Sequence, residues 1–173
     1  MTENTMSRAA PNPDRERPPA LNPAMIIVTW FGCGLSPKAP GTVGSLGALP
    51  VAWAILFYSG WTWLAVAAVA ATVIGILATA AVLKRSAVKD PSFVVIDEVA
   101  GQWIALLPAG LDPVLFIAAF LAFRLFDIWK PWPVSWADRA VPGALGVMLD
   151  DLIAGGFAAA LGYGLGYALA GGT

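Results

Sequence analysis

Long apolar segments alternate with short polar or glycine- and proline-rich segments along most of this chain. The clearest is 61–83, which carries no charged side chain and, at about 1.5 Å per residue, is long enough to cross a bilayer core of about 30 Å. Apolar segments at 46–58 and 147–170 predict two further membrane helices. The first should begin near Val43, and the glycines of the second should permit close helix packing. The pattern therefore predicts an all-α integral membrane protein.

The apolar segment at 99–123 is interrupted by a turn sequence. Residues 108–113 include two prolines and a glycine, and they leave two arms of about a dozen residues each. Each arm covers about 18 Å, which is short for a bilayer core. We therefore expect either a hairpin of short helices or a segment that enters the membrane part way. The following segment, 124–142, is polar and aromatic, and Pro131 and Pro133 should stop any helix there.

The first 46 residues lack a segment long enough to span a membrane. Residues 1–22 are rich in proline and charge, which predicts a disordered tail ahead of a single membrane domain at 23–173. A short apolar stretch follows, and the glycines and prolines of 32–46 predict an irregular loop. Thr42 or Ser45 could cap the helix after it. We expect a compact protein of about four or five helices, several of them short.

Composition supports the membrane assignment and excludes several chemistries. The chain is 58% hydrophobic and 12% charged, with a mean hydropathy of +0.73, whereas soluble domains are nearer 45–50% apolar and about 25% charged. The absence of histidine excludes a histidine base and a histidine-ligated zinc site. The single cysteine, Cys33, excludes an intrachain disulfide and a cysteine-rich metal site. A net charge of −1 gives no reason to expect a nucleic-acid partner.

The basic residues gather on one side of the predicted topology. The two expected outer turns, at 59–60 and 108–113, contain neither lysine nor arginine. All ten basic residues lie in the N-terminal segment and in the loops at 84–90 and 124–139. Cytoplasmic loops of membrane proteins are enriched in lysine and arginine, so this side should face the cytoplasm. Five acidic residues lie on the same side: Asp97, Glu98, Asp127, Asp150 and Asp151.

Five carboxylates at the ends of apolar segments are the candidate chemistry: Asp97, Glu98, Asp127, Asp150 and Asp151. Like charges about 4 Å apart repel by roughly 4 kcal/mol at an effective dielectric constant of about 20. A hard divalent cation relieves this repulsion, and Mg²⁺ prefers oxygen ligands. One acidic pair alone could be a solvated helix end. Five acids beside apolar helices, in a chain with few charges, favour a pool of Mg²⁺ ligands, one of which could orient a water.

Basic residues near these acids are candidate phosphate ligands. Arg124 and Lys130 flank Asp127, either as membrane anchors or as phosphate ligands, with arginine able to make bidentate contacts. Lys38 and Thr42 precede a predicted helix N-terminus, whose free N–H groups attract anions. Acids for a metal, bases for an anion and a membrane face together favour metal-assisted phosphoryl chemistry on a membrane-embedded substrate, with water as the nucleophile.

Four segments in order resemble the phosphatidylglycerophosphatase A family: SPKAPGTVGSL (36–46), DPSFVVIDEVAGQ (90–102), FRLFDIWKPWP (123–133) and GALGVMLDDLIAG (143–155). The resemblance extends from about Trp30 to about Gly166. It implies an all-α, Mg²⁺-dependent enzyme of the bacterial inner membrane. Such an enzyme converts phosphatidylglycerophosphate to phosphatidylglycerol and phosphate in glycerophospholipid biosynthesis. The lipid substrate and the bilayer are thus the expected partners, and the active site of this multi-pass protein should face the cytoplasm.

Three alternatives stay open at the level of sequence. The first is a phosphatase for a different lipid phosphate. The second is a transporter, whose acids should lie near the bilayer midplane and not at one face. The third is a non-catalytic partner subunit without turnover of its own. The oligomeric state, a homo-oligomer included, and the division of the acids between direct metal ligands and other roles are also left open.

Overall fold

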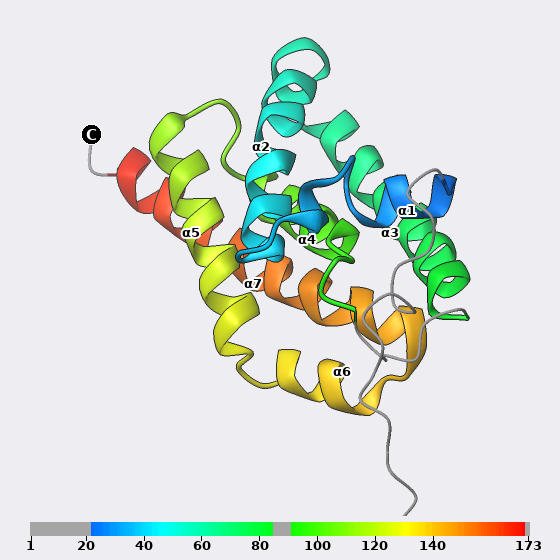
Figure 1. The fold of residues 1–173 in the computed structure, drawn as a ribbon. Helices are drawn as coiled ribbons and strands as arrows, with labels where there is room; N and C mark the ends of the chain where they lie inside the picture. Colours follow the sequence, from blue (N-terminus) through cyan, green and yellow to red (C-terminus); the bar gives the residue numbers. More distant parts are fainter. Residues whose placement is uncertain (1–21, 85–90, 172–173) are drawn as a thin grey trace, which may run out of the picture.

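The computed structural model describes residues 22–84 and 91–171. These residues form seven α-helices and one short 3₁₀ helix, with no β-strand among them (Figure 1). The predicted all-α class is confirmed. The expected disordered tail lies outside the described residues, except for Asn22, whose side chain accepts the N–H of Ala24 and so caps the first helix. The basic residues Arg85 and Lys89 also lie outside them.

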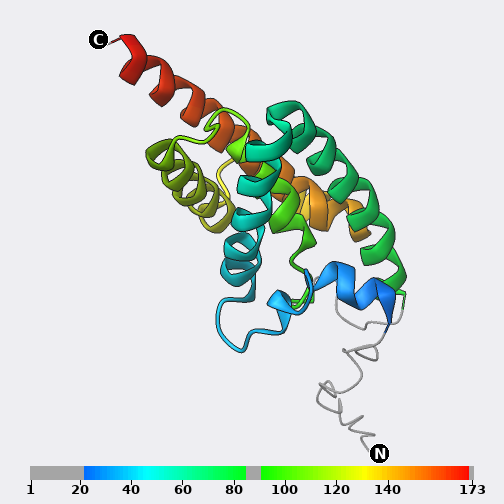
Figure 2. The same ribbon diagram turned by 90° about the horizontal axis from the view of Figure 1, so that it is seen from above.

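Three helices are long and apolar enough to cross a membrane: α2 (Pro40–Ser59), α3 (Trp61–Leu83) and α7 (Gly143–Gly171). They correspond to the three predicted membrane helices. Only 28% of the apolar window of α3 is buried inside the protein, so most of its side chains face outward, as lipid contact requires. The C-terminal end of α7 projects beyond the other helices (Figure 2).

Two of these helices begin earlier than the sequence analysis expected. Helix α2 begins at Pro40, because proline suits the first helical turn, where no N–H donor is needed. Neither expected capping residue caps it: Thr42 lies inside the helix, and the Ser45 hydroxyl donates to the carbonyl of Gly41 one turn back. Helix α7 begins at Gly143, four residues before the apolar segment that predicted it.

Helices α4 (Ile96–Leu106) and α5 (Pro113–Trp129) form the expected hairpin of short helices. Asp112 caps α5 by accepting the N–H groups of the second and third residues that follow it. Helix α5 continues past the expected boundary at residue 123 and carries Arg124 on its next turn. It ends at Trp129, and the capping residue Lys130 has a left-handed φ of 47° directly before Pro131.

Two short helices raise the number of helices above the four or five expected. Helix α1 (Pro23–Val28) packs against α3, and it is followed by the 3₁₀ helix η2 (Cys33–Leu35). Helix α6 (Val134–Ala140) packs against α7 in a segment that was expected to be loop. Pro133 directly precedes the first residue of α6 and does not disrupt it, because the first turn of a helix needs no intrahelical N–H donors.

Helix α4 is the centre of the fold and packs against α2, α3, α5 and α7 (Figures 1 and 2). Nine of its eleven residues are buried. The indole N–H of Trp103 donates to the carbonyl oxygen of Ala48 at 3.0 Å, which satisfies the one polar group of this buried ring. A short helix can therefore be held inside the bundle without spanning the membrane itself.

Glycines bring the backbones of α4 and α7 into direct contact. A Cβ atom on Gly101 would lie 2.5 Å from the carbonyl oxygen of Asp151 and 2.6 Å from a ring carbon of Phe123. A Cβ atom on Gly155 would collide with the carbonyl oxygen of Gly101. Small residues at both positions allow this close approach, as expected for the glycine-rich helix. The crossing places the first turns of α4 beside residues 150–151 of α7.

Candidate active site

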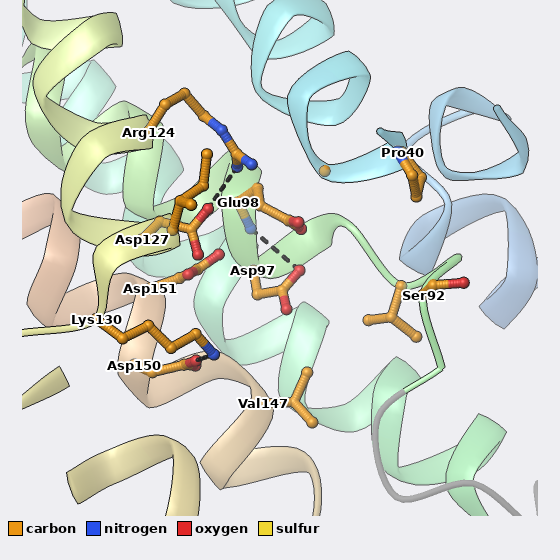
Figure 3. Close-up of a pocket in the computed structure, with 13 residues that line it drawn as sticks. Pro40, Ser92, Asp97, Glu98, Arg124, Asp127, Lys130, Val147, Asp150 and Asp151 are labelled. Carbon is orange, nitrogen blue, oxygen red and sulfur yellow. Dashed lines mark hydrogen bonds and ion pairs between the residues drawn. The ribbon is translucent and has the colours of Figure 1, made fainter. Parts of the chain in front are cut away.

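A pocket of about 270 Å³ opens where the N-terminal ends of α2 and α4 meet the C-terminal end of α5 and the early turns of α7 (Figure 3). Seven of the nine predicted site residues line it: Asp97, Glu98, Arg124, Asp127, Lys130, Asp150 and Asp151. Lys38 and Thr42 are not among its lining residues. Lys38 is exposed in the preceding loop, and Thr42 is half-buried in the first turn of α2.

The first turn of α4 supplies Asp97 and Glu98. Negative charge is favoured near a helix N-terminus, where backbone N–H groups lack intrahelical partners. The Asp97 carboxylate accepts the N–H of Glu98 at 3.1 Å. The N–H of Val95 donates to the carbonyl of Val28 at 2.7 Å and ties the start of α4 to α1. Both acids are therefore held by a backbone that is fixed on the adjacent helix.

Three carboxylates form a compact cluster. Asp97, Glu98 and Asp151 each present an oxygen, and these oxygens lie within 4.8 Å of one another. Asp97 and Asp151 are buried, and Oε2 of Glu98 is buried with no hydrogen-bond partner among residues 22–84 and 91–171. Burial raises the pKa of the Glu98 carboxyl, and the nearby Asp127 raises it further. An all-oxygen donor set that includes an unpartnered buried oxygen fits a hard cation such as Mg²⁺.

Arg124 lies between α5 and α2 at the edge of the pocket. Its Nη1 atom is 2.6 Å from Oδ2 of Asp127 and 3.3 Å from Oγ of Ser45. Arg124 and Asp127 are three positions apart on α5, which places their side chains on one face of the helix. The guanidinium has five N–H donors, and its buried Nε has no partner among the described residues. Arg124 is thus fixed by two helices and keeps N–H groups for an anion.

Lys130 bridges two carboxylates from different helices. Its Nζ atom lies 2.7 Å from Oδ1 of Asp138 on α6 and 2.8 Å from Oδ2 of Asp150 on α7. Burial lowers the pKa of Lys130, but the hydrogen bonds that its ammonium donates to these two carboxylates, with their negative charge, outweigh burial and raise the pKa above its ordinary value. Lys130 is therefore a stable cation, and one of its three N–H donors is not used by these pairs.

Asp138 and Gly41 contribute to the pocket region but were not predicted from the sequence. Asp138 lies in a segment that was expected to be loop, and no pattern in the sequence links it to a lysine eight residues earlier. Gly41 lets the first turn of α2 approach the Glu98 carboxylate, with which a Cβ atom at this position would collide. The N-terminal end of α2 therefore does reach the pocket, through Pro40 and Gly41 and not through Lys38 or Thr42.

The pocket divides its acids into two groups. Asp127 and Asp150 each contact a base, whereas Asp97, Glu98 and Asp151 form the cluster that could hold a metal. Cationic donors stand directly beside this cluster. The fold and pocket together define a helical membrane protein whose site is suited to phosphate chemistry.

Comparison with protein families identifies the family to which this membrane protein belongs. The sequence model of phosphatidylglycerophosphatase A matches residues 26–165, and the chain belongs to that family. The resemblance seen in the four sequence segments is thereby confirmed. Membership makes the protein a phosphatase, and it argues against the transporter and the non-catalytic subunit considered from sequence alone.

Three named relatives match most of the chain. A phosphatidylglycerophosphatase A of Escherichia coli is 37% identical over 84% of this chain and 85% of its own length. A phosphatidylglycerophosphatase A of Haemophilus influenzae is 31% identical over 85% of this chain and 91% of its own length. A protein of Bacteroides thetaiotaomicron, named provisionally as a phosphatidylinositol-3-phosphatase, is 38% identical over 76% of this chain and 86% of its own length. No solved structure matches the chain significantly.

Proposed function

We propose that the protein hydrolyses the terminal phosphate monoester of phosphatidylglycerophosphate and requires Mg²⁺. The products are phosphatidylglycerol and inorganic phosphate, which places the reaction in glycerophospholipid biosynthesis. The observation that carries the proposal is the cluster of Asp97, Glu98 and Asp151 beside Arg124 and Lys130 in one pocket. The substrate is proposed from the two relatives named as phosphatidylglycerophosphatase A.

The carboxylate cluster would hold the metal. Mg²⁺, when bound, supplies Lewis-acid polarisation of the phosphate and a more acidic water. Asp97, Glu98 and Asp151 provide the oxygen ligands from α4 and α7. A water molecule attacks phosphorus and gives up a proton, the bond from phosphorus to the glycerol oxygen breaks, and that oxygen takes up one proton to leave as the alcohol of phosphatidylglycerol. Because the chain has no histidine, a carboxylate is the available acceptor for the proton of the attacking water.

The two bases would bind and orient the phosphate. Arg124 offers the N–H groups that its contacts with Asp127 and Ser45 leave over, and Lys130 offers its remaining donor. Asp127 and Asp150 hold these cations in place and so act as positioning residues. Fixed donors lower the barrier because they need not reorganise as charge develops on the phosphoryl oxygens.

Phosphate release from phosphatidylglycerophosphate tests the proposal directly. We expect the protein, purified in detergent, to release phosphate with Mg²⁺ present, to stop in excess EDTA and to recover when Mg²⁺ is restored. Uncatalysed hydrolysis of phosphate monoesters is extremely slow, so background release will not obscure the result. Full turnover in excess EDTA would contradict the metal mechanism, and absence of turnover with Mg²⁺ would contradict the function.

Phosphatidylinositol 3-phosphate is the alternative substrate that the comparisons suggest. The Bacteroides relative is 38% identical to this chain, and its name refers to phosphatidylinositol 3-phosphate. Both lipids present a phosphate monoester to the pocket, so the cluster and the bases alone do not distinguish them. The same assay with the two lipids at equal mole fraction compares their kcat/KM values. A higher value for the inositol lipid would transfer the proposed function to that substrate.

We also propose that the protein lies in the bacterial inner membrane with the pocket facing the cytoplasm. Lys84, Lys130 and Arg139 lie at the ends of helices on the pocket side, whereas the turns near Gly60 and at 107–112 have no basic residue. This asymmetry is what the positive-inside rule describes. A cytoplasmic pocket would also meet the substrate on the leaflet where phospholipids are assembled.

Cysteine labelling in intact spheroplasts tests the orientation. In a Cys33→Ala background, Ser59→Cys and Leu111→Cys should react with a membrane-impermeant maleimide added outside. Ala140→Cys, on α6, should react only after the membrane is permeabilised. All three positions are exposed in the structure, so accessibility within the protein does not limit the reaction. The reverse labelling pattern would place the pocket on the outer face.

A further inference from the structure

The catalytic pocket shares two residues with a hollow on the outer surface of α5. Arg124 and Ile128 line both the pocket and this hollow of about 640 Å³. The hollow is completed by Leu121, Leu125 and Trp129. These five positions follow the spacing of one helix face, so they form a continuous stripe along α5. Leu121, Leu125, Ile128 and Trp129 are 57–71% exposed, so the stripe is apolar and largely uncovered by the described residues.

Helices α2 and α5 leave the pocket end of this stripe accessible. Away from the pocket they meet through Trp53 and Phe116, whose rings contact edge to face at 5.1 Å. Beside the pocket the described residues link them through the hydrogen bond from Arg124 to Ser45. The two helices are not a closely packed pair in the described part of the chain. A long side chain, and not helix packing, therefore separates the pocket from the outer face of α5.

The other walls of the pocket that the described residues form lead to charged or buried side chains. On the α6 and α7 side, the wall is the charged bridge of Lys130 with Asp138 and Asp150. Behind the acids, α4 is buried in the bundle. Two apolar hollows lie along α3, but neither shares a lining residue with the pocket. Exposed apolar side chains are ordinary on a membrane protein, whereas continuity with the catalytic pocket distinguishes the stripe on α5.

We propose that the stripe of Leu121, Leu125, Ile128 and Trp129 is the docking surface for the acyl chains of the phospholipid substrate. The inference rests on the proposed function, because it requires a phosphate monoester carried by a lipid. Such a molecule must place its phosphate among charged groups while its chains stay in an apolar phase. Arg124 stands where the two parts meet, because its guanidinium contacts Asp127 in the pocket and the residue also lines the hollow on α5. The lipid then enters sideways from the membrane along α5.

Kinetics with substrates of different chain length test this surface. The double variant Leu121→Gln with Leu125→Gln, and the milder Leu125→Ala, should raise KM for a dioleoyl phosphate-monoester lipid by about fivefold, with kcat nearly unchanged. KM is expressed as mole fraction in detergent micelles. For a dihexanoyl analogue the effect should shrink to less than about twofold, because little chain remains to contact the stripe.

A matched control separates the stripe from general lipid contact. Val66 and Leu77 are also exposed apolar residues, but they lie on α3 and line none of the hollows described. The double variant Val66→Gln with Leu77→Gln should leave KM for both substrates within about twofold of wild type. Equal increases for the two double variants, or an unchanged KM in both α5 variants, would overturn the proposal.

Photocrosslinking gives a second readout that needs no turnover. Two probes carry the same diazirine on the acyl chain, one on a phosphonate analogue of the phosphate-monoester lipid and one on phosphatidylcholine. The phosphonate probe should label residues 113–129 more strongly than the phosphatidylcholine probe does. Labelling of α3, which reports contact with bulk lipid, should persist when dihexanoyl substrate is added. Identical labelling patterns would mean that the stripe only faces bulk lipid. If wild type releases phosphate from neither chain length with Mg²⁺, the proposed function fails instead.

Discussion

Asp151→Asn should reduce phosphate release at least about a hundredfold, with Asp97→Asn and Glu98→Gln giving losses of similar size. The three side chains converge within 4.8 Å, so each amide removes one anionic oxygen from the same metal-binding cluster. The folded protein should survive, because an amide keeps the shape of a carboxyl and removes repulsion between neighbouring carboxylates. Steady-state rates at increasing Mg²⁺ concentration, together with thermal unfolding in detergent, measure both effects.

The other two acids and a remote aspartate serve as controls. Asp127→Asn and Asp150→Asn should affect KM for the lipid more than the Mg²⁺ concentration at half-maximal rate, because these residues hold Arg124 and Lys130. Asp112→Asn should retain wild-type activity, since asparagine also caps α5 and Asp112 does not line the pocket. If all three cluster variants keep wild-type rates and Mg²⁺ dependence, the cluster is structural and the assignment is wrong.

Hydropathy predicted the three long apolar helices because each is a continuous run of apolar residues that is long enough to cross a membrane. In a bilayer the backbone must satisfy its own hydrogen bonds, so a long uncharged segment such as 61–83 has one regular structure available. Helix α6 gives no such signal. Its buried residues, Val134 and Ala137, are a single pair at i and i+3, too short a pattern to define a period. Its packing on α7, and not its own sequence, makes it helical.

The five acids predicted from the sequence meet in one pocket, but the sequence did not predict which of them contact bases and which contact one another. Five carboxylates in a chain with few charges already indicated a metal or phosphate site. Whether a given acid meets a base or another acid depends on distances between helices, such as the 2.8 Å from Lys130 to Asp150. The same limit applies to Arg124, whose contact with Ser45 joins residues 79 positions apart. Lys38 was predicted to bind phosphate because it precedes a helix start in the sequence. It does not line the pocket, and its role stays a prediction.

Gly101→Ala should both destabilise the protein and reduce activity at least about tenfold. Alanine gains up to about 1 kcal/mol in helix propensity over glycine. Overpacking of a close contact costs about 1–3 kcal/mol or more, and here the new methyl would face the backbone carbonyl of Asp151 at 2.5 Å. A backbone atom cannot rotate away as a side chain can, so α4 and α7 must separate. Overpacking therefore outweighs propensity, and Asp151 moves away from Asp97 and Glu98.

A glycine on the facing helix provides the matched control for this crossing. Gly156 follows Gly155 on α7, and a Cβ atom there would meet nothing within 4 Å. Gly156→Ala should be neutral or stabilise the protein by up to about 1 kcal/mol, whereas Gly155→Ala should resemble Gly101→Ala. Thermal unfolding and phosphate release are measured on the same preparations. Wild-type stability and rate in Gly101→Ala would show that the two helices can separate without cost, and that close backbone contact does not set the geometry of the acid cluster.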